Sequence, residues 1–105
     1  MGKFLKKSLK EGIIKMLYSM FLLRDNCYVN IFVMREYEDR DGNKRLIIRV
    51  EQKDNVVHFC EWTFPDKVCF KAFGFSRLDL AKIKDYLAVN ESIILNNWEN
   101  YHKNL

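Results

Sequence analysis

The feature that most constrains the fold is a series of alternating apolar and polar stretches in residues 27–73, separated by short turn signals. In the cleanest stretch, residues 44–51, Leu46, Ile48 and Val50 fall on one side and charged residues on the other. A period of two is typical of a strand with one buried face, and closely spaced turns connect antiparallel neighbours. Residues 27–73 therefore predict a four-stranded antiparallel meander.

Two helices are predicted after the last strand, within residues 76–103. Ser76 and Asp79 have the spacing of a capping box, and Asn90 can cap the second helix. Apolar residues recur at helical spacing in both helices, which favours packing on one face of the sheet. The predicted core consists of Leu46, Ile48, Val50, Leu80, Ile83, Leu87, Ile94 and Trp98.

The first 24 residues predict a basic amphipathic helix, because apolar residues recur at helical spacing from Phe4 to Leu23. Its candidate interaction stripe consists of Leu9, Ile13, Leu17 and Met20. Three interpretations stay open for this helix: packing on the sheet of the same chain, binding of a second chain, and adsorption to an anionic membrane. The expected fold is thus α+β, with an N-terminal amphipathic helix, a four-stranded meander and two C-terminal helices packed on the sheet.

Charge is concentrated in the same N-terminal segment. Residues 1–24 hold six Lys or Arg and one acidic residue, whereas residues 25–105 hold twelve basic and thirteen acidic residues. The candidate anion- or partner-binding cluster of this segment consists of Lys3, Lys6, Lys7 and Lys10. Binding of nucleic acid or lipid through such a cluster is expected to weaken as salt rises.

Length and cysteine content suggest a single intracellular domain. A chain of 105 residues suits one hydrophobic core, so residues 1–105 are expected to form one domain. Three cysteines without a C-x-x-C spacing indicate neither a disulfide framework nor a zinc ribbon. No apolar run reaches the length of a membrane span, and no secretory signal is recognised. We therefore expect a cytoplasmic protein without a cofactor or a metal.

The C-terminal third contains a distinctive series of residues: Gly74-Phe75-Ser76, Leu80, Ile83, Asn90-Glu91, Ile94, Leu95, Trp98, Glu99 and Tyr101. This series carries a resemblance to the DUF4160 family of small bacterial proteins of unknown function. The resemblance implies an interaction module in a toxin–antitoxin-like pair. The family also has a His-x-His pair on its second strand, where this chain has Arg45 to Val50 without histidine, so an activity of that pair is not implied here.

Three groups of side chains are candidate sites. Arg45 and Arg49 share one strand face, and guanidinium groups bind phosphates and carboxylates; the alternative is a solvated face with cross-strand ion pairs. His58 and Cys60 also share a strand face and could begin a metal site, but a buried core cysteine is the expected arrangement. The Trp and Phe residues could stack on single-stranded nucleic acid, although most of them are expected in the core.

The expected function is therefore a non-catalytic interaction module with a protein partner or a second copy. One alternative is a nuclease-like toxin that uses Arg45, Arg49 and an acidic residue. The other is a peripheral membrane protein that uses the N-terminal helix. A nucleic-acid partner has only weak support from the sequence, because the basic residues form one stretch and not a broad face.

Overall fold

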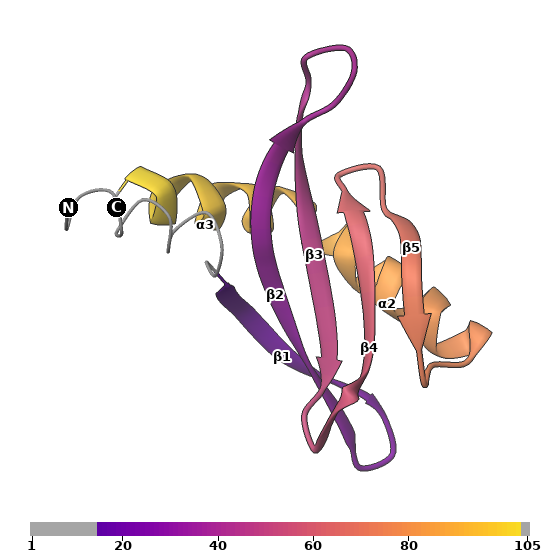
Figure 1. Ribbon diagram of the computed structural model, residues 1–105. Coiled ribbons are helices and arrows are strands. Elements are labelled where there is room, and N and C mark those ends of the chain that lie inside the picture. The colour runs from indigo at the N-terminus through magenta and orange to yellow at the C-terminus, as the bar shows by residue number, and fades with distance from the viewer. Residues whose placement is uncertain (1–14, 104–105) are drawn as a thin grey trace, which may run out of the picture.

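The computed structural model describes residues 15–103, except for the side chain of His102. The chain forms one five-stranded antiparallel sheet followed by two helices (Figure 1). Its elements are β1 (Met16–Arg24), β2 (Cys27–Glu38), β3 (Lys44–Gln52), β4 (Asn55–Phe64), β5 (Val68–Phe73), α2 (Arg77–Val89) and α3 (Glu91–Lys103). The strands follow one another in the sheet in chain order. The predicted α+β class and antiparallel meander are therefore confirmed, but the strand count is five, not four.

The N-terminal helix is the part of the predicted fold that is wrong. Met16–Arg24 is a strand that pairs antiparallel with β2, so Leu17 and Met20 lie on a strand and not on a helix. Asp25 and Asn26 form the tight turn between β1 and β2, and Asn26 has a φ of 57°. Asparagine tolerates this left-handed conformation better than most residues.

The physical reason lies in the uncharged run Met16–Leu23, whose apolar residues satisfy a helical and a strand period equally well. Pairing with β2 decides between the two, because a strand here places Leu23 in the core and packs Tyr18 and Phe21 against it. The remaining predicted helix residues, Leu9 and Ile13, and the lysines at positions 3, 6, 7 and 10 lie outside the described residues.

Both helices pack on the same face of the sheet and lie behind it in Figure 1. The buried cluster joins alternate residues of the strands, such as Ile31 and Ile48, to Ile83 and Leu87 of α2 and Ile94 of α3. All the predicted core residues are buried in it except Leu80, which is partly buried. The predicted capping box is also present: Ser76 Oγ accepts from the Asp79 amide at 3.1 Å.

The C-terminal helices hold β1 in place through its inward-facing side chains. The ring of Phe21 stacks on Tyr86 of α2 with centroids 4.2 Å apart, and Arg24 Nε donates to buried Asp79 at 3.1 Å. Ser19 also hydrogen-bonds Tyr86. Strand β1 is thus fixed to α2 as well as to β2, although these elements are far apart in the sequence.

Candidate functional site

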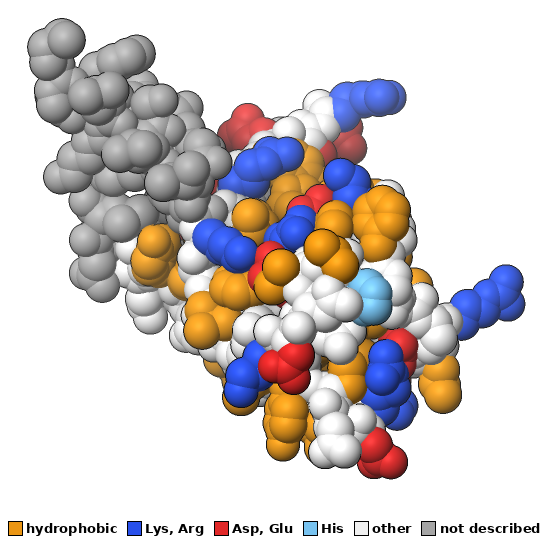
Figure 2. Space-filling view, turned by 60° about the horizontal axis from the view of Figure 1, so that its bottom comes forward, with side chains coloured by type: hydrophobic (Ala, Val, Ile, Leu, Met, Phe, Trp, Pro, Cys, Tyr) orange, Lys and Arg blue, Asp and Glu red, His pale blue; other side chains and the backbone are white. Residues whose placement is uncertain are grey.

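The face of the sheet opposite the helices is not covered by any helix or strand of the described part of the chain. Strand alternation places Arg49 and Glu51 of β3 on this face, while Ile48 and Val50 point to the core. The register aligns Arg49 with Phe32 of β2 on one side and with Glu61 of β4 on the other. We refer to this surface as the open face; Figure 2 shows it obliquely.

A network of ion pairs occupies the centre of the open face. Glu51 accepts from Arg49 Nε at 2.7 Å and from Lys15 Nζ at 2.9 Å, and Arg49 Nη1 also donates to Glu61 at 2.8 Å. Glu51 is only 7% exposed, and burial works to raise its pKa. The hydrogen bonds from Arg49 and Lys15 outweigh that effect and hold the pKa of Glu51 below its ordinary value.

The network also fixes the charge of Arg49. Partial burial works to lower the pKa of this guanidinium, but the hydrogen bonds to Glu51 and Glu61 raise it overall. Arg49 therefore stays cationic and Glu51 stays anionic at neutral pH. Side chains in this state balance each other's charge and are poorly suited to exchange protons with a substrate, since an acid or base catalyst works best with a pKa near the working pH.

Four aromatic rings on the open face are each paired with a basic side chain. Lys15 Nζ lies 4.2 Å from the ring centroid of Phe32, and the Arg49 guanidinium lies 3.7 Å from that of Phe59. Two wider pairs, Arg35 over Tyr37 at 5.6 Å and Lys53 over Tyr28 at 5.9 Å, lie near opposite ends of β2. The alternation of rings and cations thus runs over the length of β2, which is about 30 Å between Tyr28 and Tyr37 at the usual rise of a strand.

Three basic residues of the open face have no acidic partner. Arg35, Lys53 and Lys71 form no salt bridge with any carboxylate in residues 15–103. Lys71 lies opposite Glu61 in the β4–β5 pairing, two residues from Phe73. Phe73 is 54% exposed, and its ring lies 5.2 Å from that of Phe59. In Figure 2, Lys and Arg side chains stand among hydrophobic ones and are not gathered into one block.

Both predicted anion-binding arginines, Arg45 and Arg49, are already paired. Arg45 Nε donates to Asp39 at 2.9 Å, and its Nη1 lies 3.8 Å from Asp66. Asp39 also accepts from the amides of Asp41 and Asn43, so Arg45 braces the turn between β2 and β3. These contacts agree with the second interpretation of the two arginines, a face crossed by ion pairs.

The candidate metal ligands His58 and Cys60 are each engaged elsewhere. Cys60 is fully buried and accepts from Trp62 Nε1 at 3.1 Å, and burial raises the pKa of its thiol to about 12. His58 Nδ1 lies 3.0 Å from Gln52 Oε1. Within residues 15–103, no group of three or more His, Cys, Asp or Glu side chains is arranged to hold a metal ion.

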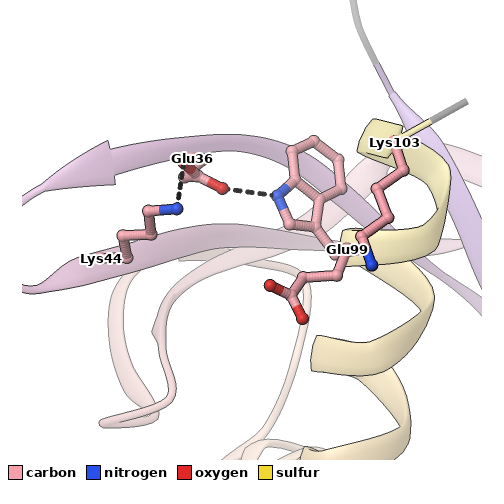
Figure 3. A pocket seen from close by; sticks show the side chains of 5 residues that line it. Glu36, Lys44, Glu99 and Lys103 are labelled. Carbon is pink, nitrogen blue, oxygen red and sulfur yellow. Dashed lines mark hydrogen bonds and ion pairs between the residues drawn. The ribbon is translucent and has the colours of Figure 1, made fainter. Parts of the chain in front are cut away.

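A shallow pocket lies where β2 and β3 meet α3 (Figure 3). It has a volume of about 170 Å³ and is lined by Glu36, Lys44, Trp98, Glu99 and Lys103. Glu36 accepts from Trp98 Nε1 at 2.9 Å and lies 3.9 Å from Lys44 Nζ. The pocket is smaller than the roughly 300–1,000 Å³ of typical small-molecule sites, and one of its two carboxylates, Glu36, already accepts from Trp98.

The sequence interpretation grouped Phe59 and Phe73 with aromatics expected mostly in the core, and it did not place Lys15 and Phe32 on the same surface as these rings. The available signal was the strand period: Phe59 and Glu61 alternate with the core residues Cys60 and Trp62 and must therefore lie on the other face. Lys15 could not be placed, because it was assigned to a helix.

Comparisons with protein-family models, curated proteins and solved structures find no match to this chain. The resemblance to the DUF4160 family therefore stays a prediction. None of the helices in residues 15–103 is long and apolar enough to cross a membrane.

Proposed function

We propose that this protein is a non-catalytic binding module whose open face binds single-stranded nucleic acid. The observation that carries the proposal is the pairing of aromatic rings with cations across β2, β3 and β4, at Phe32, Phe59, Tyr37 and Tyr28. Proteins that bind single strands without sequence preference combine aromatic stacking surfaces with basic side chains that follow the backbone. The open face has both parts on one continuous sheet.

The basic side chains of the open face fall into two groups, and this division supports single-stranded nucleic acid as the ligand. Lys15 and Arg49 are neutralised by Glu51 and Glu61, so they organise the face and position the rings. Arg35, Lys53 and Lys71 form no salt bridge within residues 15–103 and are the residues available to phosphates. Phe73 offers the most exposed ring of the face, and stacking on one ring contributes about 1–3 kcal/mol per base.

A binding role also fits the protonation states better than catalysis does. The nuclease-like alternative requires an acidic residue free to act with Arg45 or Arg49, whereas Asp39 and Glu51, which bind the Nε atoms of these arginines, each accept two or more hydrogen bonds. The pKa of Asp39 is lowered, chiefly by the hydrogen bond from the Asn43 amide, and the pKa of Glu51 is lowered as described. Both carboxylates are thus kept as structural anions.

The test is the binding of a fluorescently labelled oligothymidylate and an oligouridylate, followed by anisotropy over a range of salt concentrations. Phe73→Ala should weaken binding by about 5- to 150-fold, the equivalent of one stacked base. Lys71→Ala should reduce the slope of log affinity against log salt by roughly 0.7, the value for one phosphate of a single strand. Lys84→Ala, an exposed lysine of α2, is the matched control and should change neither quantity.

Two competitors decide between ligand classes. A duplex of the same length should bind more weakly, because its bases are already stacked on one another. Poly-glutamate presents negative charge without bases and should compete poorly. Failure of the oligonucleotides to bind, or equal affinity for poly-glutamate, would contradict the proposal. The latter result would favour an acidic protein partner, in keeping with the interaction role that the DUF4160 resemblance implies.

A further inference from the structure

The outer edge of β1 has no partner strand among the residues that the structure describes. In the described sheet, β1 pairs with β2 on one side only. Natural proteins protect such edges with charged residues, proline or very short strands, because unpaired backbone groups recruit further strands. Strand β5 follows that rule, with six residues and a central Lys71. Strand β1 does not, because Met16–Leu23 contains neither a charged residue nor a proline.

The side chains of β1 reinforce the contrast. Leu17, Met20 and Leu22 project on the open face with exposed fractions of 57%, 47% and 52%. They form an apolar ridge along the edge of the sheet. On the other face, Phe21 stacks on Tyr86 and Arg24 binds Asp79. These contacts therefore hold the strand rigidly in place. Its unpaired backbone edge stays exposed at the side of the sheet.

We propose that β1 pairs with β1 of a second copy of this chain, about a two-fold axis perpendicular to the sheet. Such an axis makes the pairing antiparallel and places the apolar ridges of both copies side by side on one face. Both copies then contribute the same residues to the interface, as a two-fold interface requires. The result is a ten-stranded sheet whose two open faces lie on the same side.

The charge pattern selects a second copy as the occupant. A strand that carried charges along its length would set like charges against each other in a self-pairing, whereas the eight residues from Met16 to Leu23 carry none. The charges at the two ends lie on opposite faces of the sheet, Lys15 beside Glu51 on the open face and Arg24 beside Asp79 on the helix side, so an antiparallel pair does not set them against each other. Each is already neutralised within its own chain, by Glu51 and Asp79 respectively. The edge is therefore complementary to itself and offers no charge by which to select a different partner.

The irregularities of β1 set the expected strength. Register shifts occur at Tyr18 and Leu23, so the regular part of the strand is Ser19–Leu22. A short backbone pairing with one apolar ridge buries less area than a permanent dimer does. We therefore expect a weak dimer that dissociates on dilution.

The test is sedimentation velocity of the full chain over a wide range of concentration. Wild-type protein should pass from monomer to dimer, and Met20→Lys should raise the midpoint concentration by about tenfold or more, because it sets two cations side by side across the axis. Val68→Lys is the matched control: Val68 is similarly exposed but lies on β5, at the opposite edge. It should leave the midpoint unchanged.

A second measurement locates the contact. Hydrogen exchange of the amides in residues 16–24 should slow as protein concentration rises, while exchange in β5 should not change. A chain that stays monomeric at every concentration would overturn the proposal. So would a dimer that Met20→Lys leaves intact, or one that Val68→Lys dissociates. None of these outcomes depends on nucleic-acid binding.

Discussion

Replacement of Glu51 by glutamine tests whether the ion-pair network stabilises the sheet. Glu51 is nearly buried and accepts two charge-assisted hydrogen bonds, from Arg49 at 2.7 Å and Lys15 at 2.9 Å. Hydrogen bonds to charged groups contribute about 1.5–3 kcal/mol each. The net loss should be smaller than their sum, because glutamine keeps an acceptor oxygen, Arg49 keeps Glu61, and the Lys15 side chain is partly hydrated. We expect Glu51→Gln to lower the free energy of unfolding by about 1–3 kcal/mol at neutral pH.

The pH dependence of this loss is the sharper part of the prediction. The folded-state pKa of Glu51 lies below its ordinary value of 4.5. A carboxyl group with a lowered pKa adds stability that is fully present above the unfolded pKa and is lost as pH falls through the folded pKa. The difference between wild type and Glu51→Gln should therefore be largest at neutral pH and should shrink once the pH falls well below 4.5.

Urea denaturation at neutral and acidic pH, followed by far-ultraviolet circular dichroism, measures both quantities. Glu38→Gln is the matched control, since Glu38 is an exposed carboxylate of β2 without a salt bridge in the described part of the chain. It should change the free energy of unfolding by less than about 0.5 kcal/mol. A Glu51→Gln protein as stable as wild type at neutral pH, or a difference that does not change with pH, would refute the reasoning.

Two further predictions concern Gly74 and Cys60. Gly74→Ala should cost about 1–3 kcal/mol in chemical denaturation, because its φ of 82° is left-handed and a new Cβ would fall on the ring of His58. Gly42→Ala, with the same φ and open space around it, should cost less; equal losses would show that His58 yields freely. In native protein at pH 8, iodoacetamide should modify Cys60 far more slowly than the partly exposed Cys69, as peptide mass spectrometry can show, because the Cys60 pKa is about 12. Comparable rates for the two thiols would contradict the burial of Cys60.

The parts of the fold that the sequence predicted are those with local signals. Strands β2 to β5 were recognisable because turns separate them, and β3 alternates between core and charged residues so cleanly that Leu46, Ile48 and Val50 were assigned correctly. The start of α2 followed from the capping box at Ser76 and Asp79. Each of these signals spans fewer than about ten residues and does not depend on distant partners.

The missed parts depend on distant partners. Whether residues 16–24 become helix or strand is decided by pairing with β2 and by packing of Phe21 on Tyr86, 65 positions later in the chain. The open face was missed for the same reason, since Lys15 reaches Glu51 and Phe32 only when β1 is a strand. A helix at this position would have hidden the pattern of rings and cations.

The attachment of β1 to the C-terminal helices also has a consequence for synthesis on the ribosome. The side-chain hydrogen bonds that hold β1 to α2 and its C-cap Asn90 connect residues 55 to 72 positions apart. The uncharged strand therefore emerges well before the helix that secures it, and contacts of such long sequence separation form late in folding. An uncharged, proline-free β segment is prone to aggregate before α2 is available to pack on it. Chaperone demand should thus be concentrated in the interval between translation of β1 and release of α2, and a pause before the α2 codons would lengthen that interval.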